Sequence, residues 1–456
     1  MTVPQLPARL HPDIADFLQS NAEIERIVEM FGSPTHVVFP HLVAENVSNF
    51  QEVLHAHKQD DADIFFATKV NKSEAFLSQA AHSHIGIDVS SEQELKAALS
   101  HGIPGNQISI SGPAKNKALQ VLGIRTGSTF ALDDIAELHA LIGASKSLTP
   151  NEKIPTTIRL NGGSKSFSRF GVDDKTLPDL LEVLSHQDCP VQLDGFSFHL
   201  AGYSTEDRVV ALQHAIQALH EARMKGLHPN TINIGGGFAV QYLEEEDWNR
   251  FLAERDASTY LSGDLKSSLY PHAGELAGAD ALHAILSART ETHETIAALL
   301  KDEGIRLAIE PGRSLVDQAG ITCMQVKNIR RASDETFIIQ VEANINHLSE
   351  QWFNADYCVD PIHMGSGSDS DVPTEASIVG NTCLEIDVLS WRKIGFSRLP
   401  QAGDILVYPN TAGYQMDSNE SEFHRIPLPE KLAAFKKNNT WQYKPDSRYS
   451  IADTLL

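Results

Sequence analysis

Charged residues and glycines that could do chemistry stand where short apolar runs of the sequence end. These residues are Lys69, Asp88, Arg159, His199, Gly235, Gly236, Gly237, Glu310 and Arg313. A lysine at the end of a buried strand is costly unless its amine is paired, solvated or chemically used. The glycine run directly follows the apolar stretch TINI, where exposed backbone N–H groups can hold a phosphate. An amine, an imidazole, carboxylates and a phosphate cradle together indicate an enzyme active site.

Each of these features also has a purely structural interpretation. Lys69 could be a strand-end lysine that extends its amine into solvent, and GGGF could be a simple tight turn. His199 could be a satisfied structural histidine, and EPGR could be a loop with a surface ion pair. All of these interpretations would have to hold at once on consecutive strand ends, so we favour a shared site.

The sequence repeats one pattern, an apolar run followed by a polar turn and an amphipathic stretch. The elements that this pattern predicts would position the candidate residues. Eight apolar runs occur between residues 63 and 312: DIFFATKV, GIDVSS, QISISG, TFALDD, TTIRLNG, LDGFSFHL, TINIGGGF and RLAIEPG. Segments with apolar residues at three- and four-residue spacing, such as LPDLLEVLSHQ, separate them and indicate helices. Eight such units predict an α/β fold, a closed (β/α)8 TIM-type barrel whose strand carboxyl ends face the active site. We interpret the long gap at about 239–300 as an insertion at that end.

The character of the sequence changes after residue 315. The β-like runs GITCMQVKNIRR, TFIIQVEANI and GDILVYPNTAGY follow one another without long helices between them. They predict a C-terminal, mainly-β domain over 316–456, after a barrel over 41–315. The N-terminal segment 1–40 contains PTHVVFP and is expected to pack with the β domain.

Composition limits the classes of function. The length of 456 residues predicts more than one ordinary core, and a formal charge of −23 argues against nucleic acid or an anionic membrane as partner. The sequence contains no run of about 18 apolar residues, so we expect no transmembrane helix. The start of the sequence, MTVPQLPARLHPDI, lacks the pattern of a secretory signal. The four cysteines are widely spaced, which suits reduced thiols better than disulfides or a zinc site. We therefore expect a cytoplasmic protein without a metal that acts on a small molecule.

The motifs occur in an order typical of a known family. They are ATKVN, GIDVSSEQEL, RLNGG followed by SRFGV, FSFHLAG, NIGGGF, EPGRSLV and GNTCLEID. From about residue 32 to 425 the chain resembles the fold-type III pyridoxal-phosphate decarboxylases, the ornithine, arginine and diaminopimelate decarboxylases related to alanine racemase. The resemblance implies that pyridoxal 5'-phosphate is the cofactor and that an amino acid substrate loses its carboxylate as carbon dioxide.

The resemblance also implies a role for each residue at the cofactor. Lys69 would form the Schiff base with the cofactor aldehyde, a role that needs an amine whose pKa partial desolvation lowers. The triplet Gly235–Gly237 and Arg313 would bind the phosphate. Glu310 would bond the pyridine nitrogen, and His199 would stack on the ring face away from the lysine.

Four further positions complete the implied site. Asp88 and Arg159 would lie near the ring, and Tyr414 would lie near the phosphate. Cys383 would return a proton to the substrate carbon in the pocket of the other subunit. The resemblance therefore implies a homodimer with shared active sites.

The position after Cys383 departs from the family pattern. Decarboxylases of diamino acids carry an acidic residue there, which pairs with the distal amine of the substrate, whereas this chain has Leu384 followed by Glu385. A buried ammonium without its counter-charge is costly, and Glu385 could compensate only if the loop were re-registered. We therefore expect an amino acid or amino-acid conjugate with a neutral or acidic distal end, as in decarboxylases of siderophore or other secondary-metabolite biosynthesis.

Other interpretations stay open. The chain could be a diamino-acid decarboxylase of the ornithine or diaminopimelate type, or an amino acid racemase on the same fold. Racemases use a tyrosine as the second acid and base, where this chain offers Cys383. A non-catalytic relative would commonly lack Lys69 or Cys383, and a sugar-phosphate barrel enzyme would give these two residues no linked purpose.

Overall fold

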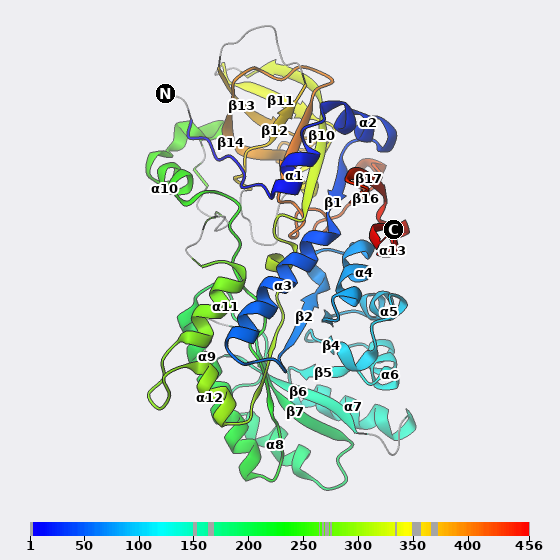
Figure 1. Ribbon diagram of the computed structural model, residues 1–456, viewed down its shortest axis with the longest axis vertical. Helices are drawn as coiled ribbons and strands as arrows, with labels where there is room; N and C mark the ends of the chain where they lie inside the picture. Colours follow the sequence, from blue (N-terminus) through cyan, green and yellow to red (C-terminus); the bar gives the residue numbers. More distant parts are fainter. Residues whose placement is uncertain are drawn as a thin grey trace.

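The chain forms a barrel with a β domain at one end of it (Figure 1). The computed structural model describes residues 3–148, 153–162, 168–263, 265–266, 269, 273, 276–332, 335–348, 357–365 and 373–455. Within these residues, no helix has both the length and the apolar character that crossing a membrane requires.

Eight parallel strands close into the barrel in chain order. They are β2 (Asp63–Ala67), β3 (Gly86–Val89), β4 (Ile108–Ile110), β5 (Thr129–Leu132), β6 (Ile154–Leu160), β7 (Val191–Phe198), β8 (Thr231–Asn233) and β9 (Arg306–Ile309). The barrel closes because β2 pairs with both β3 and β9. The eight apolar runs of the sequence are these strands, so the expected (β/α)8 barrel with a mainly-β domain is confirmed.

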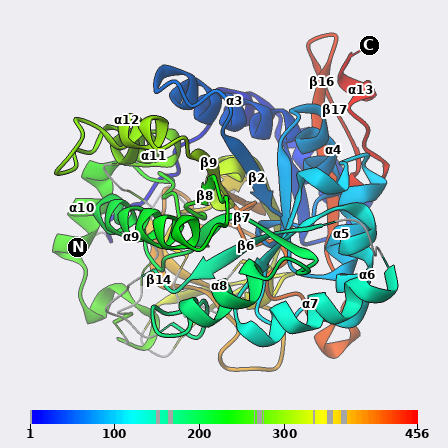
Figure 2. The ribbon, with the colours of Figure 1, turned by 90° about the horizontal axis from the view of Figure 1, so that it is seen from below.

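Helices surround the barrel on its outside (Figure 2). They are α3 (Pro40–Ala56), α4 (Glu74–His82), α5 (Glu92–Ser100), α6 (Lys117–Thr126), α7 (Ile135–Leu148), α8 (Leu177–Ser185), α9 (Thr205–Met224), α11 (Gly278–Ser287) and α12 (Ile296–Asp302). Several begin at a side chain that accepts a hydrogen bond from a backbone N–H of the first turn: Ser73 for α4, Ser91 for α5 and Asn116 for α6. These caps fix where each strand-to-helix loop ends, and the loops at this end carry the candidate site.

The region between β8 and β9 has two parts. Residues 239–263 contain α10 (Glu245–Glu254) and contribute Tyr242 and Tyr260 to the core of the β domain. The backbone of Tyr260 forms an isolated antiparallel β-bridge with Arg392 there. Helices α11 and α12 instead belong to the outer layer of the barrel, and α11 packs beside α3 and α9. The second half of the expected insertion is therefore the helical connection that a barrel needs before its last strand. Residues 264, 267–268, 270–272 and 274–275 of that stretch lie outside the described residues.

The β domain is built on one nine-stranded sheet. Its strands are β1 (Thr35–Val38), β10 (Gly320–Arg331), β11 (Phe337–Val341), β12 (Ile362–Met364), β13 (Thr374–Val379), β14 (Val388–Phe396), β15 (Ile405–Pro409), β16 (Glu430–Lys437) and β17 (Thr440–Pro445). Strand β1 from the N-terminal segment lies between β10 and β16 and pairs with both. The domain boundaries at residues 40 and 315 stay a prediction.

Short helices complete the described structure. They are α1 (Pro12–Phe17), α2 (Asn21–Phe31) and α13 (Ala452–Leu455), with 3-10 turns η1 (Thr68–Val70), η2 (Gly105–Gln107), η3 (Ala257–Thr259), η4 (Leu261–Gly263), η5 (Arg313–Val316), η6 (Ile345–His347), η8 (Phe423–Arg425) and η9 (Asp446–Arg448). Two of these turns, η1 and η5, follow barrel strands and carry candidate site residues.

Candidate active site

Lys69 lies in η1, directly after β2. The hydroxyl of Thr68 donates to the backbone oxygen of Asp88, 3.1 Å away, and also lies 3.0 Å from Glu94 Oε1. The backbone N–H of Ala67 donates to the carbonyl of Pro311 at 3.4 Å. These contacts hold the lysine between β3 and the segment that follows β9, at the carboxyl end of the barrel.

The charge of Lys69 is stabilised by its neighbours. Its side chain is accessible to solvent, yet enough protein surrounds it for burial to oppose the charge. The attraction of Asp88, Tyr414 and Glu310 outweighs that burial and raises the pKa of Lys69 above its ordinary value. Desolvation acts in the expected direction, but the net lowering of the pKa that we expected is not found in the chain without its cofactor, because the sequence does not show how close the two carboxyl groups lie.

The buried Asp88 and the half-buried Glu310 form a pair of acids beside the lysine. Burial first, and the charge of Glu310 second, raise the pKa of Asp88 to about 8. Burial also raises the pKa of Glu310, whose Oε1 accepts a hydrogen bond from Asn233 Nδ2 at 2.6 Å. Among the described residues, Asp88 Oδ1 is a buried oxygen without a hydrogen-bond partner. The hydrogen-bonding capacity of this oxygen is therefore unfilled within the described residues.

We expect the Asp88→Asn substitution to raise the free energy of unfolding of the cofactor-free protein. This gain over the unchanged chain should be larger at pH 8 than at pH 5. Between about pH 4 and pH 8 the folded protein keeps a proton on Asp88 that the unfolded chain has released, so stability falls as the pH rises through this window. Asparagine has no such proton to lose. The gain at pH 8 should be at least about 1 kcal/mol, because each unit of pKa shift corresponds to about 1.4 kcal/mol.

Urea unfolding of both proteins at pH 5 and pH 8 measures this difference. Asp188→Asn, at an exposed position, is the control and should leave the pH dependence unchanged. An Asp88→Asn effect of equal size at both pH values would contradict the prediction.

The triplet Gly235–Gly237 forms a turn after β8 into which no side chain fits. A Cβ atom at Gly236 would lie 2.4 Å from the carbonyl oxygen of Glu310, and one at Gly237 would lie 2.1 Å from Arg208 Nη2. The backbone at Gly237 also has a φ of +78°, a left-handed value that favours glycine. The turn is thus bare backbone, as an anion cradle requires.

Two N–H groups of this turn already have partners inside the protein. Gly235 N–H donates to Asn233 Oδ1 at 2.9 Å, and Gly236 N–H donates to His199 Nδ1 at 3.3 Å. The same Asn233 holds Glu310, so one amide connects the glycine turn to this half-buried acid.

Arg208 of α9 supports the turn from behind. Its guanidinium is buried and donates to the carbonyl oxygens of Gly202, Ser204 and Gly236 at 2.9, 2.8 and 3.1 Å. Three carbonyl acceptors on two loops hold the turn to the start of α9.

His199 directly follows β7 and lies against the glycine turn. Its side chain is accessible to solvent, yet enough protein surrounds the ring for burial to lower its pKa to about 3, and the positive charges of Lys69, Arg159 and Arg208 add to this effect. The ring is therefore neutral at physiological pH. Because Nδ1 accepts the hydrogen bond from Gly236, the ring proton lies on Nε2.

Arg313 and Tyr414 meet beside the turn η5. The guanidinium of Arg313 lies 4.7 Å from the centre of the Tyr414 ring, and its Nη1 donates to the carbonyl oxygen of Gly413 at 2.5 Å. The Tyr414 backbone N–H donates to the carbonyl of Val70 at 2.9 Å. A loop of the β domain is thereby joined to the turn that carries Lys69.

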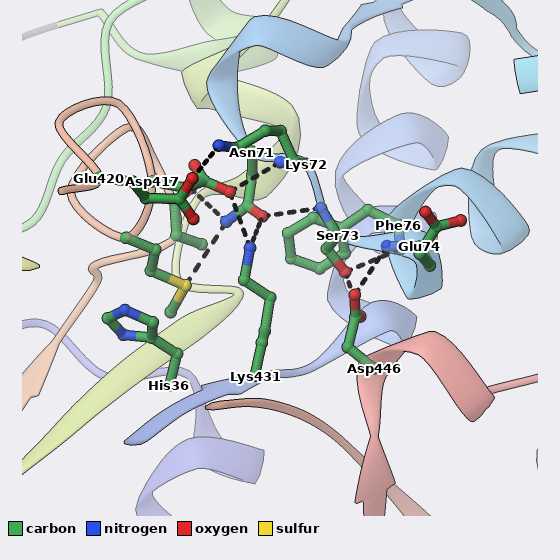
Figure 3. A network of polar contacts seen from close by, with 12 residues as sticks. His36, Asn71, Lys72, Ser73, Glu74, Phe76, Asp417, Glu420, Lys431 and Asp446 are labelled. Atoms are coloured by element: carbon green, nitrogen blue, oxygen red, sulfur yellow. Dashed lines mark hydrogen bonds and ion pairs between the residues drawn. The ribbon is translucent and has the colours of Figure 1, made fainter. Parts of the chain in front are cut away.

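A polar network fastens this loop further (Figure 3). Asn71 Nδ2 donates to the Ala412 carbonyl at 2.9 Å, and the backbone N–H of Lys72 donates to Asp417 Oδ2 at 2.9 Å. Lys431 Nζ donates to both Asn71 Oδ1 and Asp417 Oδ2, at 2.8 and 2.7 Å. The segment after Lys69 is thus tied to the β domain by side chains that lie far away in the sequence.

Arg159 lies at the end of β6. Its guanidinium is 4.6 Å from the centre of the Phe170 ring and 3.9 Å from Asp133 Oδ1. It belongs to the same electrostatic cluster as Lys69, since its charge acts on Lys69, His199 and Glu310.

Cys383, Leu384 and Glu385 lie in the turn between β13 and β14. All three are exposed, and Leu384 keeps 49% of its surface accessible. The polar contact described for the Cys383 thiol is with His424 Nε2, at 3.2 Å, and not with a group of the barrel. The structure therefore brings the barrel residues and Tyr414 together, while these three residues lie on the β domain.

Three contributors were missed from the sequence: Asn233, Arg208 and His424. Asn233 stands at a strand end two positions before the glycine turn, so the rule that found the other residues could have found it. Arg208 lies within a helical pattern and His424 within a loop, and neither carries a sequence signal.

The fold and the site define a class of protein. It is a barrel enzyme with an appended β domain, whose strand ends present a lysine, buried carboxyl groups and a bare-backbone turn.

Comparisons with known proteins agree with this class. The family model described as "Pyridoxal-dependent decarboxylase, pyridoxal binding domain" matches residues 41–317. The protein y4yA of Sinorhizobium fredii is 35% identical over 407 residues, 89% of this chain and 88% of that protein. The diaminopimelate decarboxylase of Zymomonas mobilis is 23% identical over 86% of this chain and 85% of its own length.

Solved structures share the fold. Diaminopimelate decarboxylase from M. jannaschii, in complex with L-lysine, superposes with a TM-score of 0.73 at 19% identity over 92% of this chain and 90% of its own. The arginine decarboxylase of Paramecium bursaria Chlorella virus, bound to agmatine, gives 0.69 at 17% identity over 90% of this chain and 99% of its own.

The chain belongs to the pyridoxal-dependent decarboxylases. It is a pyridoxal-phosphate-dependent amino acid decarboxylase, a carboxy-lyase. The residues present fit the cofactor, because the glycine turn presents bare backbone as a phosphate cradle requires, Lys69 offers an amine and Asp88 has a buried oxygen without a partner among the described residues.

Proposed function

We propose that the residues around Lys69 bind pyridoxal phosphate and direct its chemistry. When bound, the cofactor supplies an electron sink for the electron pair that departing carbon dioxide leaves behind. Lys69 would hold the cofactor through its amine and release that bond when a substrate amine arrives. The observation that carries this proposal is the electrostatic cluster of Lys69, Asp88 and Glu310 beside the glycine turn.

The remaining barrel residues would bind and orient the cofactor. Gly237 would donate its N–H to the phosphate, because the N–H groups of Gly235 and Gly236 are already engaged, and Arg313 and Tyr414 would lie at the same end. Glu310, oriented by Asn233, would bond the pyridine nitrogen.

The groups around the ring would complete this arrangement. His199, neutral and fixed by Gly236, would stack on the ring. Asp88 and Arg159 would set the electrostatic environment of the cofactor ring.

We propose that Cys383 gives a proton to the α-carbon of a substrate bound by a second copy of the chain. In one chain Cys383 is exposed on the β domain, with Leu384 and Ile386 exposed beside it, so these side chains are available to a partner. The protein would then be a homodimer with shared active sites. A cytoplasmic location also stays a prediction.

The substrate that we propose is an amino acid or amino-acid conjugate whose distal end is neutral or acidic. Leu384 supports this, because an exposed leucine beside the proposed proton donor offers no counter-charge to a distal ammonium. A role of the enzyme in siderophore or other secondary-metabolite biosynthesis stays a prediction.

Carbon dioxide release over a panel of substrates tests the proposal. The panel contains ornithine, lysine, diaminopimelate, arginine, glutamate and conjugates of glutamate or citrate with amino acids. Preference for the conjugates or for acidic amino acids would support it. Efficient release from the diamino acids with poor release from the others would overturn it.

The diamino-acid alternative rests on specific observations. Relatives and structural neighbours are named diaminopimelate decarboxylases, and the M. jannaschii structure is a complex with L-lysine. Glu385 lies next to Leu384 and is exposed, so it could take the role of the missing acid. A Glu385→Gln variant that lost only its activity toward diamino acids would favour this alternative. The racemase alternative predicts loss of optical activity without release of carbon dioxide.

We expect the Cys383→Ala variant to keep its fold and its bound cofactor but to lose about 10²- to 10⁴-fold in turnover, the usual range for a lost general acid. The turn itself should survive, because Asp387 holds Thr382 through two hydrogen bonds that do not involve the thiol. Cys189→Ala, at a buried cysteine of the barrel, is the matched control. Turnover and products equal to those of the unchanged chain would exclude Cys383 as the proton donor.

A further inference from the structure

His424 is the polar neighbour of the Cys383 thiol. The distance from Cys383 Sγ to His424 Nε2 is 3.2 Å, although 41 positions separate the two residues. The imidazole lies against the Phe423 ring, with ring centres 4.3 Å apart and ring planes 30° apart. Both members of the pair are exposed, so a substrate and water can reach them.

The turn that carries the thiol is held in place. Asp387 Oδ2 accepts hydrogen bonds from the backbone N–H and the hydroxyl of Thr382, at 2.9 and 2.6 Å. Asp387 Oδ1 accepts one from the backbone N–H of Ile345, at 2.7 Å. The aspartate is buried, so Cys383 is presented on a fixed turn and not on a loose loop.

The backbone that carries the imidazole is strained. His424 has a φ of +61°, a left-handed value that few residues other than glycine adopt. Such backbone persists only where the surroundings impose it, and it concentrates at functional sites. Here it accompanies a histidine whose Nε2 lies within hydrogen-bond distance of the thiol.

We propose that His424 is a positioning residue that acts through Cys383, fixing the thiol and restoring its proton after each turnover. The inference rests on the proposed role of Cys383 as proton donor. In the resting pair the thiol donates its hydrogen bond to Nε2, which fixes the direction of the S–H bond.

The protons balance over one turnover. The S–H bond of Cys383 breaks as a C–H bond forms on the α-carbon, and a thiolate remains. The neutral ring of His424 takes one proton from solvent at Nε2 and gives it to that sulfur, which restores the resting pair of thiol and neutral imidazole. One solvent proton is consumed, which matches the hydrogen that replaces each released carbon dioxide.

The test compares two glycine substitutions at neighbouring positions. His424→Gly removes the imidazole, and glycine adopts the existing φ without strain. Arg425→Gly is the matched control, because Arg425 is also exposed and has a φ of +58°. With the best substrate of the panel, we expect kcat of His424→Gly to fall at least about 10-fold with KM unchanged, and added imidazole to restore part of it. Arg425→Gly should keep both constants.

A second measurement needs no substrate. Iodoacetamide is added to each holoenzyme at neutral pH, and mass spectrometry follows alkylation of the Cys383 peptide. A neighbouring imidazole increases the reactivity of a thiol, so alkylation should be about 10-fold slower in His424→Gly and unchanged in Arg425→Gly. Alkylation of the buried Cys189, Cys323 and Cys358 would reveal an unfolded variant, and His424→Asn would then replace it, since asparagine tolerates this backbone.

The outcomes separate this inference from the proposed function. Slower alkylation with a fall in kcat that imidazole restores supports the inference. Unchanged alkylation, or slower alkylation with unchanged kcat, overturns it. Full turnover in Cys383→Ala would instead show that the proposed proton donor is wrong, whatever the alkylation of Cys383 reports about the pair.

Discussion

Replacement of Lys69 by alanine is expected to lower carbon dioxide release at least about 10⁴-fold, the size seen when a covalent catalytic group is removed. The variant loses the amine that would hold the cofactor, and the nearby Lys72 amine is paired with Glu420. The fold should survive, because hydrogen bonds of Thr68, Asn71 and Tyr414 hold η1 in place. None of these hydrogen bonds involves the amine of Lys69.

Two measurements check this result. Borohydride treatment of the unchanged holoenzyme should abolish its visible cofactor absorbance and add the cofactor mass to the Lys69 peptide, whereas Lys69→Ala should acquire no label. Lys72→Ala is the matched control, because the Lys72 amine pairs with Glu420 at the surface. Label on another lysine, or turnover retained in Lys69→Ala, would contradict the assignment.

The Gly237→Ala variant is expected to bind pyridoxal phosphate at least about 100-fold more weakly, which corresponds to about 2.7 kcal/mol. The new Cβ would meet Arg208 Nη2 at 2.1 Å, and this guanidinium cannot move away freely because three carbonyl oxygens hold it. The turn must therefore shift, and with it the N–H that we assign to the phosphate.

Gly226→Ala separates this clash from simple backbone strain. Gly226 has a φ of +79°, nearly equal to that of Gly237, but a Cβ there would meet nothing within 4 Å. Gly226→Ala should lose only about 1 kcal/mol of stability and keep its affinity for the cofactor. Titration with pyridoxal phosphate followed by absorbance, together with urea unfolding, measures both quantities. Equal affinity in the two variants would exclude Gly237 from the phosphate site.

The sequence by itself determined the barrel and most positions of the candidate site. Strand and helix periodicity is a local property, so the eight apolar runs and the amphipathic segments between them could be located without the structure. Closure of the barrel then places every strand end on one side, which is why Lys69, Asp88, His199 and Glu310 could be grouped before any coordinates.

Only the tertiary structure decided how these groups act on one another. The raised pKa of Lys69 follows from the through-space charges of Asp88 and Glu310, which no local pattern records. The support of the glycine turn by Arg208 and the pairing of Cys383 with His424 join residues 28 and 41 positions apart. Electrostatic interactions and hydrogen bonds depend on distance in space, and distance in space between such residues is set by packing.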